Sequence, residues 1–216
     1  MRFKFAMLID GGFVRARMRK WAQVSGNVAP IHSLIPDFVR RIPDHSQLRD
    51  HSLYRVFYYD GEPFKGKIEN PLDGTVRNFG KSDEFYNNQD MLTGLESMSH
   101  VAVRRGKTKF RGWKINPPKS CSESDIKINA NDLRPRVEQK GVDMRIGLDI
   151  AALSLKQFVD VLVLVSGDSD FVPALKFART EGRQIVLFTL DHDVAQELKI
   201  HTDVCVEDTL GDIMAS

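Results

Sequence analysis

Aspartate side chains directly follow two wholly apolar segments of this sequence. Residues 161–165 are Val-Leu-Val-Leu-Val and lead through Ser-Gly into Asp168 and Asp170, while residues 5–9 lead into Asp10. Apolar segments without polar alternation are typical of parallel strands that helices cover on both faces. Because ligands of open α/β sheets bind beyond the carboxyl ends of such strands, these three aspartates are predicted to lie at a binding or catalytic edge.

A helix predicted over residues 141–158 contributes two more carboxylates, those of Asp143 and Asp149. Six helical residues place them about 120° apart and roughly 9 Å along the axis, so they can line neighbouring parts of one pocket. Acids gathered without partners repel one another, and their joint presence is explained if they hold Mg²⁺ or Mn²⁺, which prefer carboxylate oxygen. A metal held in this way can activate a water molecule and stabilise charge on a phosphodiester.

The same aspartates also have a simpler structural explanation, which the sequence leaves open. Aspartate is a favoured N-cap residue, so Asp10 and Asp168 can each begin the helix that follows them. Acids in the first turn of a helix, such as Asp143, complement the helix dipole.

A strongly basic segment lies between Arg104 and Lys119, with seven Lys or Arg residues and no acid. Phe110 and Trp113 lie among these cations, and such a mixture suits nucleic acid because cations neutralise phosphates while rings stack on unpaired bases. The alternative is a structural hairpin whose Trp113 packs onto the core. The predicted nucleic-acid contacts are Arg15, Arg104, Arg105, Lys107, Lys109, Arg111, Trp113 and Lys140.

The 216 residues are 42% hydrophobic and 28% charged, as in ordinary globular proteins, and one domain spanning residues 1–216 is predicted. The net charge is only +2, so a polyanion must be bound by local clusters of cations. The apolar segment at residues 5–9 is too short for a signal peptide or membrane span, and a cytoplasmic protein is predicted. Cys121 and Cys205 lack a CxxC partner, which argues against a zinc site or a disulfide framework.

Strands and helices alternate along the chain, which predicts an α/β fold around a central, mostly parallel sheet. Residues 64–80, rich in Gly and Pro, are predicted to form a loop, and residues from about 104 to 135 a basic, polar insertion. The expected strands span residues 3–9, 53–59, 101–104, 161–165, 183–189 and 204–206, and the expected helices span 13–23, 35–41, 83–98, 141–158, 173–181 and 193–200.

Three motifs, in this order, resemble those of the NYN domain, a PIN-like nuclease family that includes the LabA-like bacterial proteins. They are Leu8-Ile9-Asp10-Gly11-Gly12, Lys140-Gly141-Val142-Asp143 followed by Asp149, and Ser166-Gly167-Asp168-Ser169-Asp170-Phe171. The resemblance implies a three-layer, PIN-like and Rossmann-like α/β fold and a ribonuclease site that uses Mg²⁺ or Mn²⁺. It gives catalytic and metal-binding roles to Asp10, Asp143, Asp149 and Asp168, with Asp170 as a further matching acid. The chain departs from the family at Gly12-Phe13, where many members have an asparagine soon after the first aspartate.

The leading hypothesis is therefore a metal-dependent nuclease that acts on single-stranded or structured RNA. The alternative is a domain of the same fold that binds nucleic acid or a protein without cleaving it. Two other enzyme classes fit less well, because an aspartyl phosphotransferase needs an acid in place of Gly12 and a Toprim site needs glutamate in place of Asp10. The sequence leaves open RNA versus DNA, endonuclease versus exonuclease action, and the oligomeric state, a homo-oligomer included.

Overall fold

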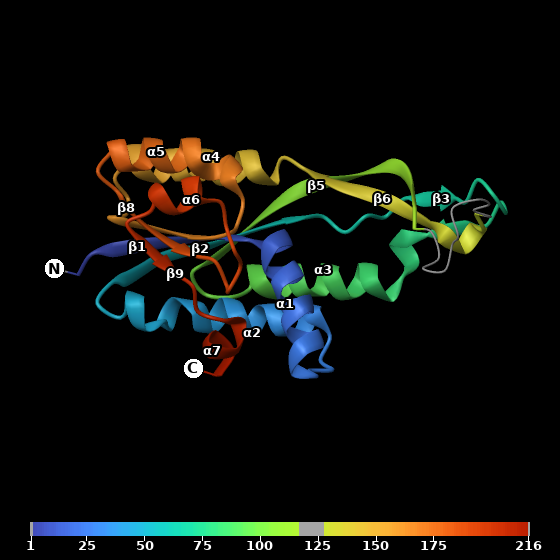
Figure 1. Cartoon of the computed structure of the whole chain (residues 1–216), viewed down its shortest axis with the longest axis horizontal. Helices are drawn as coiled ribbons and strands as arrows, with labels where there is room; N and C mark the ends of the chain where they lie inside the picture. The colour runs from blue at the N-terminus through green and yellow to red at the C-terminus, as the bar shows by residue number, and fades with distance from the viewer. Residues whose placement is uncertain (1, 117–127, 216) are drawn as a thin grey trace.

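The computed structural model describes residues 2–116 and 128–215, and a seven-stranded sheet forms its centre (Figure 1). The strand order is β6-β5-β2-β1-β7-β8-β9, and every neighbouring pair is parallel except the antiparallel pair of β5 and β6. The mostly parallel α/β sheet predicted from the sequence is confirmed. The strands of this sheet are β1 (Lys4–Asp10), β2 (Ser52–Gly61), β5 (Val101–Ile115), β6 (Leu133–Lys140), β7 (Val161–Val165), β8 (Gln184–Phe188) and β9 (Val204–Val206).

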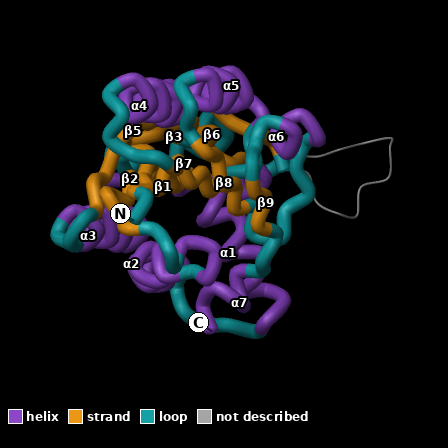
Figure 2. The backbone as a smooth tube through the Cα atoms, turned by 90° about the vertical axis from the view of Figure 1, so that its left-hand side faces the viewer, coloured by secondary structure: helices purple, strands orange, loops and turns teal. Residues whose placement is uncertain are grey.

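Helices cover both faces of the sheet, which gives three layers (Figure 2). One face carries α4 (Val142–Leu155), α5 (Val172–Thr180) and α6 (Gln196–Ile200). The other face carries α1 (Gly11–Ser25), α2 (Ile31–Arg41), α3 (Asp83–Glu96) and α7 (Leu210–Ala215). Short 3-10 helices are η1 (Ile42–Asp44), η2 (Ser46–Leu48), η3 (Phe79–Lys81), η4 (Ala130–Asp132) and η5 (Ser169–Phe171). Within residues 2–116 and 128–215, no helix has the length and apolar character needed to cross a membrane.

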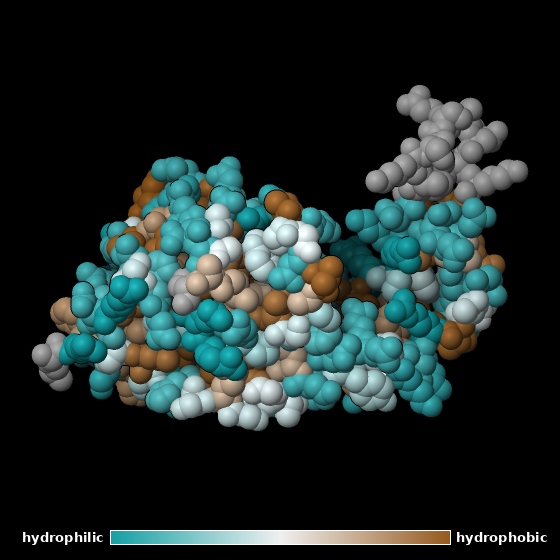
Figure 3. All heavy atoms as spheres, turned by 90° about the horizontal axis from the view of Figure 1, so that it is seen from below, coloured by the Kyte–Doolittle hydropathy of each residue, from teal (hydrophilic) through white to brown (hydrophobic). Residues whose placement is uncertain are grey.

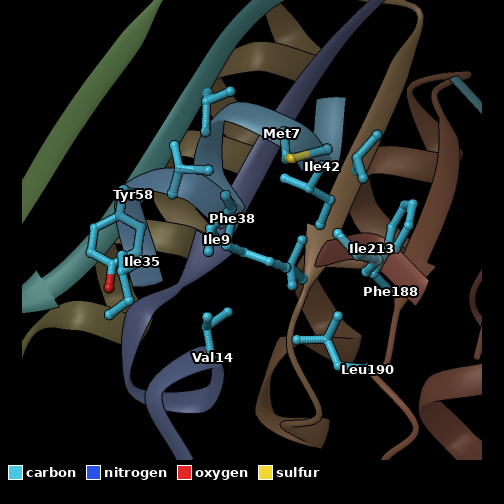
Figure 4. Close-up of a cluster of buried hydrophobic side chains, with 14 of the residues drawn as sticks. Met7, Ile9, Val14, Ile35, Phe38, Ile42, Tyr58, Phe188, Leu190 and Ile213 are labelled. Atoms are coloured by element: carbon cyan, nitrogen blue, oxygen red, sulfur yellow. The ribbon is translucent and has the colours of Figure 1, made fainter. Parts of the chain in front are cut away.

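The central strand β1 contributes side chains to two separate hydrophobic cores. Phe5, Met7 and Ile9 pack into the core shared with α1, α2, α3 and α7, and Figure 4 shows Met7 and Ile9 in this cluster. Ala6 and Leu8 pack into the opposite core, under α4, α5 and α6. Both faces of β1 are therefore buried, which is why its sequence shows no polar alternation. This double packing holds the end of the strand, and with it Asp10, in a fixed position.

The basic segment belongs largely to the central sheet. β5 extends to Ile115, well beyond the predicted end at Arg104, because it continues past its parallel partner β2 and pairs with β6 as an antiparallel hairpin. Along β5, the exposed Lys107 and Lys109 alternate with the less exposed Thr108, as expected where one face of a strand is open to solvent. Residues 117–127 of the predicted insertion lie outside the described residues.

The loop predicted over residues 64–80 is wrong in part, because this segment contains a small hairpin. β3 (Lys67–Glu69) and β4 (Val76–Asn78) pair antiparallel, and Gly74 in the connection has φ of 71°. Strands of three residues are too short to show a period in the sequence, and Gly and Pro dominated the prediction there. The terminal helix α7 was also not predicted, and α6 is shorter than the helix expected over residues 193–200.

Candidate active site

Asp10 lies at the carboxyl end of β1 and joins it to the neighbouring strand β7. Its Oδ1 accepts a hydrogen bond of 3.1 Å from the backbone N–H of Phe13, so Asp10 is the N-cap of α1. Its Oδ2 accepts a hydrogen bond of 3.3 Å from the hydroxyl of Ser166, which directly follows β7. The predicted placement of Asp10 at the strand edge and its simpler role as a helix cap are thus both realised.

Asp168 is held by the same turn. The Ser166 hydroxyl accepts a hydrogen bond of 3.3 Å from the backbone N–H of Asp168. Asp168 in turn caps η5, because its Oδ1 accepts a hydrogen bond of 2.9 Å from the backbone N–H of Asp170. Ser166 therefore links the carboxylate of Asp10 to the backbone that carries Asp168, and it fixes the relative position of the two strand ends.

Asp143 comes from the first turn of α4 and faces the other acids. Burial raises its pKa first, and the negative charges of Asp168 and Asp170 raise it further. Burial likewise raises the pKa of Asp10, with Asp143 as an added cause, although hydrogen bonds from Phe13 and Ser166 oppose the shift. We call Asp10, Asp143, Asp168 and Asp170 the acid cluster.

The acid cluster has the charge of a cation site without the compact geometry of one. None of its four carboxylates forms a salt bridge with a described Lys, Arg or His. In the two described ranges, no three His, Cys, Asp or Glu side chains converge closely enough to hold a metal ion as they stand. The structure thus brings the four acids into electrostatic contact, without placing three of them in one coordination shell.

Asp149, predicted as a fifth member, has other partners. Its Oδ2 accepts a hydrogen bond of 2.7 Å from the Tyr59 hydroxyl and lies 3.0 Å from Nε of Arg104. Burial raises the pKa of Tyr59, and the carboxylate of Asp149 adds to the rise. The arginine also lies over the ring of Phe57, with 5.2 Å between its Cζ and the ring centroid. Asp149 therefore connects α4 to β2 and β5.

Asp60 is a buried acid that is not among the predicted site residues. It lies near the end of β2, is fully buried, and forms an ion pair with Arg15 of α1. It also accepts hydrogen bonds of 2.7 Å from the backbone N–H of Gly61 and 2.9 Å from Nε2 of Gln139. Burial raises the pKa of Asp60, while Arg15 opposes that rise. Its position after an apolar strand, like that of Asp10, was the available signal.

The predicted substrate cations divide into paired and unpaired groups. The guanidinium of Arg15 pairs with Asp60, and that of Arg104 with Asp149. Arg105 forms two bonds of 2.9 Å to Glu96, and Arg111 lies 3.4 Å from Glu138. In contrast, Lys107, Lys109 and Lys140 form no salt bridge with any described residue.

Two of the unpaired lysines lie directly opposite each other. Lys107 of β5 and Lys140 of β6 are register partners in the antiparallel ladder. Like charges in this position destabilise a hairpin unless an anion lies between them. This pair is therefore the strongest candidate on the hairpin for contact with a phosphate.

Trp113 packs against a neighbour within the hairpin. Its ring and that of Phe110 meet edge to face, with 5.9 Å between centroids, and Trp113 is the register partner of Pro135. Neither ring belongs to the two hydrophobic cores. The strand pairing is the hairpin of the predicted structural alternative, but Trp113 packs on Phe110 and not on either core, and both side chains keep partial exposure.

Two adjoining cavities lie between α1, α3 and the hairpin of β5 and β6. The first, called the aromatic pocket, has a volume of about 390 Å³ and is lined by Phe64, Phe79, Phe85, Arg19 and Gln139 among others. The second, called the basic groove, has a volume of about 680 Å³ and is lined by Lys65, Arg105, Lys107, Lys109 and again Phe64 and Phe85. Figure 3 shows the surface hollowed between the main body and the lobe where Figure 1 places β3 and the outer ends of β5 and β6.

Two glycines of the motifs allow the chain to approach its neighbours closely. A Cβ atom at Gly167 would lie 2.8 Å from both Cδ2 of His192 and Cε2 of Phe13, so no side chain fits there. A Cβ atom at Gly12 would lie 3.3 Å from Oδ1 of Asp10 and 3.9 Å from Oε1 of Gln139. The residue that departs from the family motif therefore lies between the acid cluster and the aromatic pocket.

Comparison with solved structures finds a similar fold in a crystal structure of a protein of unknown function from Vibrio parahaemolyticus RIMD 2210633. The TM-score is 0.51 and the identity 14%, over 98% of this chain and 95% of that chain, so the likeness shows the fold alone. A structure described under the mechanism and regulation of Sir2 enzymes has a TM-score of 0.40 and 9% identity, over 99% of this chain and 90% of that chain, and such a score supports no argument. No curated protein gives a significant match.

The family model of the NYN domain matches residues 83–208, which is more than half of the chain. The matched residues include Asp143, Asp149, Asp168 and Asp170, whereas Asp10 lies before them. The match confirms the resemblance drawn from the motifs, and the seven-stranded sheet has the layers that a PIN-like fold requires. The chain therefore belongs to the NYN domain family, whose fold is of the PIN-like nuclease type.

Proposed function

We propose that this protein is a metal-dependent nuclease that cleaves RNA, single-stranded or folded. The observation that carries the proposal is the acid cluster, which gathers carboxylates from β1, α4 and the turn after β7. Beyond the effect of burial, Asp143 raises the pKa of Asp10, and Asp168 and Asp170 raise the pKa of Asp143. None of these four acids has a cationic partner among the described residues, so their negative charges are left for a cation from outside the chain. Clusters of this kind are typical of functional sites. Membership of the NYN family supports the same conclusion.

The donor set of the acid cluster fits Mg²⁺ or Mn²⁺. Both are hard ions that take carboxylate oxygen, and Mg²⁺ keeps several waters while it binds through only one or two carboxylates. Three converging side chains are therefore not required. Asp10, Asp143 and Asp168 would hold the ion, with Asp170 at the rim. When bound, the metal would supply an activated water and stabilise charge on the phosphodiester.

The other residues of the site would have to bring a polyanion toward a negative centre. Lys107, Lys109 and Lys140 are free of described salt bridges, and two of these lysines line or border the basic groove. Lys140 stands three positions before Asp143, at the point where β6 leads into α4. Cations so close to the acid cluster would hold the phosphates of the strand beside it. Asp149 and Arg104 would stabilise the frame of the site through their mutual ion pair.

One observation favours the alternative of a domain that binds nucleic acid without cleaving it. Asp149, to which the family resemblance gives a metal-binding role, is neutralised by Arg104 and hydrogen-bonded to Tyr59. A site that lacks one of its acids would bind a metal more weakly. The same basic surface would then serve for binding alone.

The test is a cleavage assay on labelled single-stranded RNA, a stem-loop RNA and single-stranded DNA, in Mg²⁺, in Mn²⁺ and in EDTA. We expect cleavage of RNA that requires a divalent ion and disappears in Asp143→Asn. The matched control is Asp90→Asn, which removes an exposed acid from α3 and should leave the rate unchanged. RNA that binds and stays intact in both metals would support the non-catalytic alternative. Cleavage that persists in EDTA would contradict the proposed requirement for a divalent metal ion.

A further inference from the structure

The aromatic pocket is built from three phenylalanines that belong to neither hydrophobic core. Phe64 follows β2, Phe79 begins η3, and Phe85 lies in the first turns of α3. All three are half-buried, and none is among the residues of the two core clusters. Phe64 and Phe79 meet nearly edge to face at 5.6 Å between centroids. Rings that line a cavity without completing a core are available to a ligand.

The charges around the aromatic pocket cancel, which favours a neutral ligand. Arg15, Arg19 and Arg77 line it, together with Glu62 and Glu84. Arg15 is already neutralised by Asp60 behind it. Arg77 lies over the ring of Phe79, with 4.6 Å between its Cζ and the ring centroid. A flat, uncharged heterocycle suits such a site better than a phosphate does.

The adjoining basic groove has the opposite character. Its lining contains Lys65, Arg105, Lys107 and Lys109, against the single acid Glu62. Arg105 is paired with Glu96, and the three lysines remain without described salt bridges. The two cavities share Phe64 and Phe85, so a molecule with an anionic chain and uncharged rings can occupy both at once.

The aromatic pocket also reaches toward the acid cluster. Gln139 lines it, and Oε1 of Gln139 would lie 3.9 Å from a Cβ atom placed on Gly12, whose other near neighbour is Oδ1 of Asp10. Nε2 of Gln139 donates its hydrogen bond to Asp60. Oε1 of Gln139 has no hydrogen-bond donor among the described residues, so it can accept a hydrogen bond from a ligand. Gly12 therefore lies between Gln139 of the pocket and Asp10 of the proposed metal site.

We propose that the aromatic pocket binds one unpaired nucleobase of the RNA strand, while the basic groove binds the phosphates next to it. The inference rests on the proposed function for the identity of the ligand. The aromatic pocket has a volume of about 390 Å³, which lies in the range of roughly 300–1,000 Å³ found for small-molecule sites. Stacking on an aromatic side chain is how proteins hold single strands without strict sequence preference. A fully paired duplex cannot offer such a base, so the pocket selects single strands, loops and ends.

The test compares Phe85→Leu with Tyr86→Leu, its neighbour on α3, in a binding assay with short single-stranded RNA in EDTA. Tyr86 is more exposed than Phe85, meets its ring edge to face, and lines neither cavity. We expect Phe85→Leu to weaken binding about 5- to 100-fold, as the loss of one stacked base does. Tyr86→Leu should change it by less than about twofold. Because leucine keeps the apolar packing, the melting temperatures of the two variants should agree.

A second measurement locates the base directly. RNA that contains 5-iodouridine crosslinks to the aromatic ring on which the base stacks, and we expect the crosslinked peptides to contain Phe64, Phe79 or Phe85. Crosslinks confined to Phe110 and Trp113, or equal effects of Phe85→Leu and Tyr86→Leu, would overturn the proposal. If the wild type cleaves RNA and Phe85→Leu has no effect on binding, base binding in the pocket is contradicted and the proposed nuclease activity stands. If Phe85→Leu loses affinity but the wild type does not cleave RNA, base binding stands and the proposed nuclease activity is contradicted.

Discussion

Nε of Arg104 lies 3.0 Å from Oδ2 of Asp149, so a cation predicted to contact substrate and an acid predicted to bind metal neutralise each other. The pair connects β5 to α4 across 45 positions of sequence. The unpaired lysines of the hairpin are therefore the cations that can neutralise phosphates and so release the counterions of a bound RNA. The salt dependence of RNA binding distinguishes these two groups of basic residues.

Neutralising Lys107 or Lys140 is therefore expected to weaken RNA binding and flatten its salt dependence. Each contact with a phosphate contributes about 0.7 to the slope of log K against log salt on single strands. Lys107→Gln and Lys140→Gln should each reduce that slope by about this amount, because each removes a free charge. Arg104→Gln is the matched control, since its charge is already compensated by Asp149. An equal reduction in all three variants would show that the ion pair opens when RNA binds.

Arg15→Met is expected to destabilise the protein by about 3–5 kcal/mol at neutral pH, because it leaves the buried carboxylate of Asp60 without its cation. Burial already raises the pKa of Asp60 above its ordinary value of 3.8, and loss of Arg15 should raise this pKa further. A raised pKa means that the folded state binds the proton more tightly, so the penalty is largest above that pKa and shrinks as pH falls toward 3.8.

The control for Arg15→Met is Arg19→Met, one turn later on α1, where no described acid forms an ion pair. That change should alter the free energy of unfolding by less than about 0.5 kcal/mol. Urea titrations at a series of pH values measure both variants. A penalty in Arg15→Met that is independent of pH would contradict the role assigned to Asp60.

Asp168→Asn is expected to abolish metal-dependent cleavage while leaving the fold intact. Asparagine caps a helix as well as aspartate does, so the bond from the backbone N–H of Asp170 should survive. Loss of the negative charge should lower the pKa of Asp143 toward its ordinary value. The melting temperature without metal should stay equal or rise, and the increase that we expect Mn²⁺ to cause in the wild type should be absent from the variant. A steep fall in melting temperature would instead identify Asp168 as a structural cap alone.

Gly167→Ala is expected to reduce activity, because the added methyl group displaces a turn that carries two residues of the site. Its Cβ would lie 2.8 Å from atoms of His192 and Phe13, so the turn that carries Ser166 and Asp168 must shift. Overpacking of this kind costs about 1–3 kcal/mol. Gly147→Ala in α4 is the control, because its Cβ would meet only Ala174 at 4.0 Å and should stabilise the helix by roughly 0.5–1 kcal/mol. Unchanged cleavage by Gly167→Ala would show that the position of this turn does not matter.

The sheet and the acids at its edge could be predicted because their signals are local. The apolar segments before Asp10 and Asp168 indicate buried strands, and the carboxyl ends of parallel strands meet at one edge. Asp60 has the same position on β2, yet the Gly-Glu-Pro that follows it is also typical of a turn, so its sequence does not single it out. Its importance became visible only with Arg15 and Gln139 beside it, residues that lie 45 and 79 positions away.

The partners across the hairpin could not be predicted from composition. β6 is Leu-Arg-Pro-Arg-Val-Glu-Gln-Lys, which is too polar to indicate a strand. Its residues are in a strand because β5 offers an unpaired edge, and pairing of this kind depends on tertiary context more than on propensity. Without β6, neither the pairing of Lys107 opposite Lys140 nor the hydrogen bond from Gln139 to Asp60 has a sequence signal.

The hydrogen bond from Ser166 to Asp10 joins residues 156 positions apart, and this separation determines when the site can first exist. β7, the strand partner of β1, is made only after β1, β2, β5 and β6. Such non-local strand pairing forms late in folding. A polypeptide that is interrupted before residue 166 therefore lacks an assembled acid cluster, however completely its first strand and helix have formed.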